Sequence, residues 1–159
     1  MRIEVDDLAR PQVQSLLTDH FVALQNNVPV ELCRVLDLKT LRLPSVTVFT
    51  AWQDGVDGVL LGCGALKEID PTRGEIKSMR TAPEHLRKGV ATNIALHLVR
   101  EAQRRGYSRV SLETGRSSVY EGARRLYTSI GFEECDILEG YVPNPRSIFM
   151  DMELQRRKE

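Results

Sequence analysis

Long apolar runs, paired cysteines and an excess of charge of either sign are all missing from this sequence. No stretch approaches the roughly 20 apolar residues that a membrane-spanning helix needs. The opening residues, MRIEVDDLARPQ, also lack the apolar segment of a signal peptide, so we expect a cytoplasmic protein that does not act on membranes. Lys and Arg number 22 and Asp and Glu also number 22. A chain with no net charge has no global attraction to nucleic acid, and none is expected as a partner.

Cysteine is scarce, and its spacing excludes the usual structural roles. The three cysteines, Cys33, Cys63 and Cys135, are an odd number without a Cys-x-x-Cys pair, which argues against a disulfide framework. His20, His85 and His97 form no His-x-x-x-His pattern, so no metal site is predicted. Cys63 and Cys135 fall in strand-like segments, where we expect small core side chains rather than nucleophiles.

The apolar pattern predicts one domain over residues 1–159, with a mixed α/β (α+β) fold. Residues 1–45 would supply an N-terminal strand and helices, and residues 46–154 a core of alternating strands and helices. The predicted elements are a strand over 2–5, helices ending at Asn27 and over 30–38, strands over 46–52, 59–66 and 75–81 with a turn over 70–74, a helix ending at Gly106, a strand over 107–113, a helix ending at Gly131, and strands over 132–137 and 146–154. The early strands follow one another as hairpins, which predicts a largely antiparallel sheet with a later crossover, flanked by about four helices.

The segment EHLRKGVATN, residues 84–93, places Arg87 and Lys88 just before a predicted helix. Cations are unfavourable at that end of the helix dipole, and no capping Ser, Thr, Asp or Asn immediately precedes Gly89. The small residues Gly89 and Ala91 would let another molecule approach the backbone closely. A bound phosphate or pyrophosphate would satisfy the free amides and neutralise both cations. The alternative is a solvated loop with water on the amides, and the segment matches neither a Walker loop nor a G-x-G-x-x-G fingerprint.

Five segments occur in a fixed order: GEIKSMRTAP, HLRKGVA, a helix ending in RRGY, RVSLETG and EGARRLYTSIGF. In this order they resemble the GCN5-related N-acetyltransferases, the GNAT family. The resemblance covers residues 46–154. It implies a sheet whose central strands splay apart and an acetyl-CoA co-substrate that lies between them, with no metal.

The resemblance also implies a donor site. Amides of one stretch would bind the pyrophosphate of acetyl-CoA: Leu86, Arg87, Lys88, Gly89, Val90 and Ala91. The backbones of Met79 and Thr81 on the preceding strand would bind the pantetheine arm. The sequence departs from the family pattern twice, because Leu86 stands where Arg or Gln is usual and Tyr120 where Asn is frequent.

Acetyl transfer to an amine needs a donor for the developing oxyanion and an acid for the leaving thiolate. By resemblance, Tyr127 in the Tyr-x-x-x-Gly-Phe motif would be the general acid, and the alternative is a core aromatic. The backbone amide of Met79 would bind the oxyanion. Glu75 and Glu113 are both candidate bases, and each could instead be an ordinary charged residue at the margin of the sheet. We expect direct transfer in a ternary complex.

The acceptor is expected to be the primary amine of a small molecule. Arg80 could bind the carboxylate of an amino-acid-like amine, or it could form a surface ion pair. The loop around Tyr141 and Asn144, with the first two helices, would shape the acceptor pocket. The alternatives are a protein N-acetyltransferase, a non-catalytic acyl-CoA-binding module and a different phosphate-ligand protein. A homodimer is compatible with the resemblance.

Overall fold

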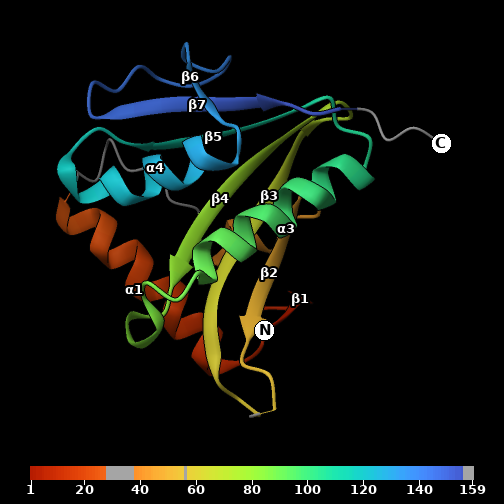
Figure 1. The fold of residues 1–159 in the computed structure, drawn as a ribbon, viewed down its shortest axis with the longest axis vertical. Coiled ribbons are helices and arrows are strands. Elements are labelled where there is room, and N and C mark those ends of the chain that lie inside the picture. The colour runs from red at the N-terminus through yellow and green to blue at the C-terminus, as the bar shows by residue number, and fades with distance from the viewer. Residues whose placement is uncertain (28–37, 56, 156–159) are drawn as a thin grey trace.

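The computed structural model describes residues 1–27, 38–55 and 57–155 (Figure 1). In chain order its elements are β1 (Arg2–Asp6), α1 (Pro11–Asn27), α2 (Leu38–Leu41), β2 (Val46–Trp52), β3 (Leu60–Asp70), β4 (Arg73–Thr81), the 3₁₀ turn η2 (Pro83–His85), α3 (Val90–Arg104), β5 (Arg109–Gly115), the 3₁₀ turn η3 (Ser118–Tyr120), α4 (Glu121–Ile130), β6 (Glu133–Cys135) and β7 (Ser147–Glu153). The helix predicted over 30–38 lies outside the described residues except for Leu38, where α2 begins.

One seven-stranded sheet organises the fold, in the order β1-β2-β3-β4-β5-β7-β6. The central pair, β4 and β5, is parallel, and every other neighbouring pair in this sheet is antiparallel. The helix α3 supplies the crossover between β4 and β5, as parallel neighbours require. The predicted mixed, largely antiparallel α/β class is therefore confirmed.

Helices cover both faces of this sheet, with α3 and α4 on one face and α1 on the other (Figure 1). Residues of α3 spaced three and four apart form a buried stripe: Val90, Ile94, Ala95, Leu98, Val99 and Ala102. This stripe lies close to β3, because a Cβ added at Gly64 would stand 2.9 Å from Ile94 and 3.1 Å from Leu98. The absence of a side chain on this part of β3 therefore lets the crossover helix pack directly on the sheet. On the other face, Val13, Leu16 and Leu17 of α1 join a separate buried cluster.

The parallel ladder between β4 and β5 is short. It pairs Arg73 with Arg109 and ends where Ile76 pairs with Leu112, although β4 continues to Thr81 and β5 to Gly115. Beyond that last pair the two strands diverge (Figure 1). The splayed central strands implied by the family resemblance are thus present.

A β-bulge interrupts β4 just beyond this point. Cys63 of β3 pairs with Arg80 and Ala65 pairs with Lys77, so between these pairs one residue of β3 lies opposite two of β4, Ser78 and Met79. Ser78, within the bulge, has a φ of 55°, a left-handed conformation that is unusual for a residue other than glycine. The extra residue reverses the alternation of side chains, so that Lys77 and Arg80 point to the same face of the sheet.

Several strands begin or end at other residues than the sequence predicts. The strand predicted from Tyr107 begins at Arg109, because the Tyr107 amide bonds Ala102 O (3.1 Å) and closes α3 in a Schellman-type end at Gly106. The Phe132 amide likewise bonds Tyr127 O and closes α4, so β6 begins only at Glu133. The turn predicted over 70–74 is shorter, because β3 extends to Asp70 and β4 starts at Arg73.

In the described parts of the chain, no helix combines the length and the apolar character needed to cross a bilayer.

A buried carboxylate fastens the start of α1 to the sheet. The side chain of Asp6, at the end of β1, is 0% exposed and accepts hydrogen bonds from the Leu8 amide (2.8 Å), Thr50 Oγ1 (3.1 Å) and Arg10 Nη2 (2.9 Å). The Arg10 guanidinium also lies 4.0 Å from the centroid of the Trp52 ring. One carboxylate thus links β1, β2 and the residues that lead into α1.

Replacing Asp6 with Ala should lower the free energy of unfolding by about 2–4 kcal/mol, because it leaves the Leu8 amide and the Thr50 hydroxyl without their buried acceptor and removes one of the two carboxylates paired with Arg10. The neighbouring exposed carboxylate provides a matched control, since Asp7 accepts only from the Ala9 amide among the hydrogen bonds described. Asp7→Ala should cost less than about 1 kcal/mol. Urea unfolding of both variants measures the difference, and equal losses would show that the Asp6 network contributes no special stability.

Candidate active site

The turn that leads into α3 presents backbone amides without protein acceptors. Gly89 occupies the N-cap of α3 with a φ of 80°, and no side chain caps the helix. The first bond of the helix is donated by the Asn93 amide to Gly89 O (3.1 Å), so the amides of Val90 and Ala91 have no partner within the helix. Arg87 also has a positive φ of 62°. A left-handed non-glycine residue beside an uncapped helix is the kind of backbone strain found at ligand sites.

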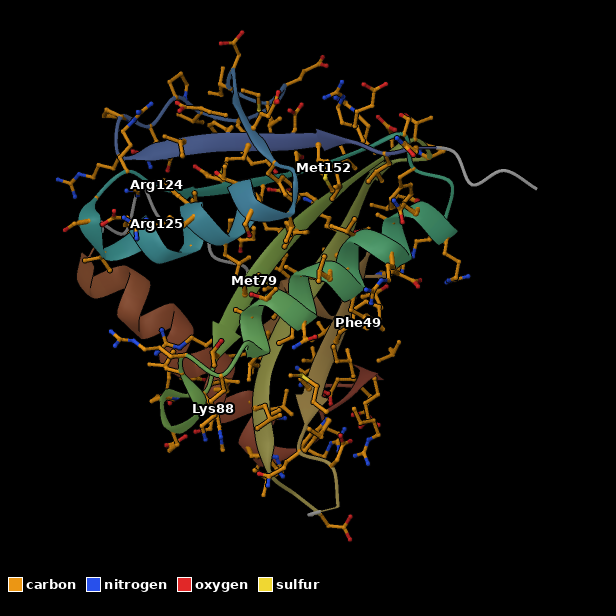
Figure 2. All side chains as sticks on the ribbon, in the orientation of Figure 1. Phe49, Met79, Lys88, Arg124, Arg125 and Met152 are labelled. Carbon is orange, nitrogen blue, oxygen red and sulfur yellow. The ribbon has the colours of Figure 1, made fainter. Side chains whose placement is uncertain are left out.

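The cations in this turn are available to an anion. Arg87 and Lys88 are exposed, and within the described chain neither forms an ion pair with a carboxylate. Lys88 Nζ lies 3.3 Å from His85 Nδ1, and Figure 2 shows Lys88 at the turn before α3. Leu86, where the family usually has Arg or Gln, is 57% exposed. Because a leucine side chain carries no charge and no hydrogen-bond donor, only the backbone of this residue can contribute to anion binding.

The strand before this turn offers a free backbone edge. From Lys77 to Thr81, β4 has no partner on its β5 side, because the parallel ladder has already ended. Ser78 and Met79 also have no partner in the register with β3, because both lie in the bulge. The Met79 side chain packs toward α3, against the position of Gly64, so this residue is anchored while its backbone lies in the bulge. The predicted donor residues therefore form one continuous path from the bulge to the start of α3.

Tyr127 lies on the α3 and α4 side of the sheet. It is 7% exposed, belongs to the main core cluster and packs its ring edge-on against Phe132 at 5.7 Å between centroids. Burial raises the pKa of the Tyr127 hydroxyl well above its usual range. The hydroxyl therefore stays protonated at neutral pH, which is the state that a general acid needs.

Glu75 lies on the opposite face of β4 and is fully enclosed. It is 1% exposed, so the alternative of an ordinary charged residue at the sheet margin does not hold for Glu75. Its carboxylate accepts a hydrogen bond from the Tyr141 hydroxyl and lies 3.3 Å from Lys77 Nζ. Lys77 is also 5.9 Å from the centroid of the Tyr141 ring. This cluster attaches the loop that contains Tyr141 to the central strand.

Glu113 belongs to the same face and is half-buried. It is the first residue of β5 beyond the last pair with β4, so it lies where the strands begin to part. Phe149 of β7 is paired directly with Glu113, and the Tyr141 ring packs edge-on against Phe149 at 5.5 Å. The structure thus groups Glu75 and Glu113 around Tyr141 and places Tyr127 on the other side of the sheet.

Sequence analysis missed three contributors to this region. Lys77 could have been found, because strand alternation places it on the same face as Glu75. The bulge at Ser78 could not, because no glycine marks it. Arg124 on α4 was also missed (Figure 2). Its Nη1 donates hydrogen bonds to Gly115 O (2.6 Å) and Ser117 O (2.8 Å), which link α4 to the end of β5. Tyr120, at the position where the family often has Asn, packs its ring over Gly115.

Neither described cysteine has the character of a nucleophile. Burial raises the pKa of the Cys63 thiol to about 12, and Cys63 is 0% exposed. Burial is also the main cause that raises the pKa of Cys135 to about 11. Among the described residues, His, Cys, Asp and Glu form no group of three or more that could hold a metal ion.

Comparison with known proteins places this arrangement in a family. The model of the acetyltransferase (GNAT) family matches residues 10–132. The chain is 46% identical over 154 residues to the uncharacterized N-acetyltransferase YsnE of Bacillus subtilis (strain 168), covering 97% of this chain and 100% of that protein. It is 40% identical over 157 residues to the uncharacterized N-acetyltransferase YedL of Escherichia coli (strain K12), covering 99% and 97%.

The fold is also shared with a solved structure. A Bacillus subtilis acetyltransferase in complex with CoA superposes with a TM-score of 0.70 at 19% identity, covering 97% of this chain and 99% of that one. The family model matches most of the chain, and the two relatives align along nearly its whole length. These matches point to the same family as the resemblance in sequence, which also implied the separated central strands. The chain belongs to the acetyltransferase (GNAT) family and is an acyltransferase.

Proposed function

We propose that this protein transfers the acetyl group of acetyl-CoA to the primary amine of a small molecule, by direct attack in a ternary complex in the cytoplasm. One observation carries the proposal: the edge of β4 beyond its ladder with β5, the bulge at Ser78 and the uncapped start of α3 lie close together along the chain, with only the short turn η2 and the residues up to Gly89 between β4 and α3. A long ligand that ends in phosphates needs a polar backbone along its arm and an anion site at its end. This path supplies both.

The residues present fit acetyl-CoA. The amides from Leu86 to Ala91 would bind the pyrophosphate, with Arg87 and Lys88 adding charge, and the backbones of Met79 and Thr81 would bind the arm. A protein of the same fold has been crystallised with CoA, which supports this choice of donor. Acetyl-CoA supplies the activated acyl group, and the chain supplies its position and the proton transfers.

Each chemical role has one best-placed group. The amide of Met79, which lies in the bulge and has no partner residue in the register with β3, would stabilise the oxyanion. Tyr127, kept protonated by burial, would give its proton to the leaving thiolate. Glu113, at the point where the strands part, would take the proton of the attacking amine directly or through water. Glu75 is already bonded to Lys77 and Tyr141, so we propose that it positions the acceptor loop rather than acting as the base.

Direct transfer is supported by the state of the thiols. An acyl-enzyme route through cysteine needs a thiolate, and the raised pKa values of Cys63 and Cys135 keep both thiols protonated at neutral pH. A small-molecule acceptor, rather than a basic protein tail, is favoured by the net charge of zero, which provides no special attraction to a polycation.

The general acid is tested by Tyr127→Phe. This variant should lower kcat by about 10²-fold with little change in the KM for acetyl-CoA, because the hydroxyl acts on the leaving group. Tyr107→Phe is a matched control, since Tyr107 is also buried and its hydroxyl bonds Glu68 far from the proposed chemistry. Thiol release from acetyl-CoA across a panel of amines measures both variants. Equal turnover by wild type and Tyr127→Phe would exclude the acid role.

The anion site is tested by the double variant Arg87→Ala with Lys88→Ala. It should raise the KM for acetyl-CoA by about tenfold or more and lower kcat less, because two charges near the pyrophosphate are lost while the amides remain. Arg100→Ala with Arg104→Ala removes two cations further along α3 and should leave this KM unchanged. An unchanged KM in the first variant would mean that Arg87 and Lys88 are only solvated side chains.

The two carboxylates are separated by conservative substitution. Glu113→Gln should lower kcat by more than about tenfold, as expected for a base. Glu75→Gln should instead raise the acceptor KM and lower the melting temperature, because Lys77 loses its buried partner. Steady-state kinetics and thermal melts of both variants distinguish the roles. A larger kcat loss in Glu75→Gln at wild-type stability would reverse the assignment.

A further inference from the structure

Arg80 is a charged residue of β4 beside the bulge at Ser78. It lies on β4 opposite Cys63 of β3 and is half-buried. Its Nε is buried and has no hydrogen-bond partner. In the described part of the chain, no carboxylate forms an ion pair with its guanidinium. Burying a cationic donor without a partner is costly, so such a group in a native protein requires an explanation.

The neighbouring cation on this face, Lys77, is already neutralised. Lys77 lies 3.3 Å from the Glu75 carboxylate and near the Tyr141 ring. Arg80 reaches the same face only because the bulge at Ser78 adds a residue between the two cations. In a regular strand, residues 77 and 80 would point to opposite faces, and Arg80 would face α3. The same distortion that frees the Met79 backbone therefore directs an uncompensated guanidinium to the side of the sheet where Glu75, Glu113 and Tyr141 gather.

We infer that Arg80 binds the carboxylate of the acceptor, so that the protein acetylates amino acids or close analogues in which a carboxylate lies near the amine. This inference rests on the proposed function, because it uses the Met79 amide as the place where the thioester carbonyl is bound. The Cα atoms of Met79 and Arg80 are about 3.8 Å apart, as in any trans peptide. An amine that attacks at Met79 therefore has its own carboxylate close to Arg80.

The chemistry of the guanidinium fits this role. Its planar donors bind a carboxylate with two parallel hydrogen bonds, a geometry that an uncharged amide or an ester cannot match. A partly buried site strengthens the discrimination, because an acceptor without the carboxylate would leave the guanidinium unpaired away from water. The site should therefore reject simple amines more strongly than it rejects a change of side chain on an amino acid.

The test compares matched acceptors on the full-length protein. The twenty amino acids and their carboxamides are assayed by thiol release from acetyl-CoA with wild type, Arg80→Met, Arg80→Lys and, as a control for loss of an exposed arginine, Arg100→Met. The measured quantity is the ratio of kcat/KM for the best acid to that for its amide. Comparing this ratio between variants removes the difference in basicity between the two amines.

Arg80→Met should lower the ratio by about 100-fold and Arg80→Lys by less, because lysine keeps the charge but not the paired donors. Arg100→Met should leave it unchanged. Because Nε has no partner to lose, Arg80→Met should melt within about 2 °C of wild type, which excludes misfolding as the cause. Amides accepted as well as acids by wild type, or a ratio that survives in Arg80→Met, would overturn the inference while leaving the acetyltransferase proposal intact.

A second readout does not depend on turnover. With CoA bound, preferred amino acids should raise the melting temperature of wild type, their amides should not, and Arg80→Met should respond to neither. If no amine is acetylated but this pattern of shifts appears, the carboxylate site stands and the proposed reaction fails. If the acids neither turn over nor shift the melting temperature, the inference about Arg80 is wrong.

Discussion

The functional geometry depends on one constraint, the early end of hydrogen bonding between β4 and β5. These central strands pair from Arg73 with Arg109 to Ile76 with Leu112 and then separate. The paired half joins the N-terminal and C-terminal parts of the sheet into one layer. The separated half exposes an edge of β4 in the middle of the molecule, where a strand would ordinarily be fully paired. In the proposed mechanism, Met79 on β4 and Glu113 on β5 both lie just beyond this point of separation.

The separation also divides the chemistry between two faces. Tyr127 and the start of α3 lie on the face covered by α3 and α4, and the Glu75, Glu113 and Tyr141 cluster lies on the face of α1. A group bound between the strands is therefore accessible from both sides. One side suits departure of the thiol, and the other suits approach of the amine. In a continuous sheet the two sides would be insulated from each other by the backbone.

The sequence predicted the fold class and the strands and helices of the core, because local rules decide them. The stripe on α3 and the stop at Gly106 are local patterns, and the free amides before Val90 follow from the lack of a capping residue. The bulge at Ser78 was not predicted, because the left-handed conformation of this serine is fixed by the pairing of its neighbours Lys77 and Arg80 with β3 rather than by its own preference. The burial of Glu75 was missed for a similar reason: its partner Tyr141 is 66 residues away in the chain. Contacts of that kind follow from topology and not from composition.

The uncapped N-terminus of α3 has a consequence for how the reaction responds to acidity. Peptide N–H groups do not titrate, and arginine stays charged over the whole range in which proteins are studied. In the proposed mechanism the phosphate end of the donor would therefore be bound mainly by groups whose state is independent of pH, and Leu86 adds no ionisable side chain to them. The ionisable side chains of this turn are Lys88 and its neighbour His85, as well as Glu84, so the other ionisable groups of the proposed mechanism are the acceptor amine, the carboxylates of the opposite face and Tyr127.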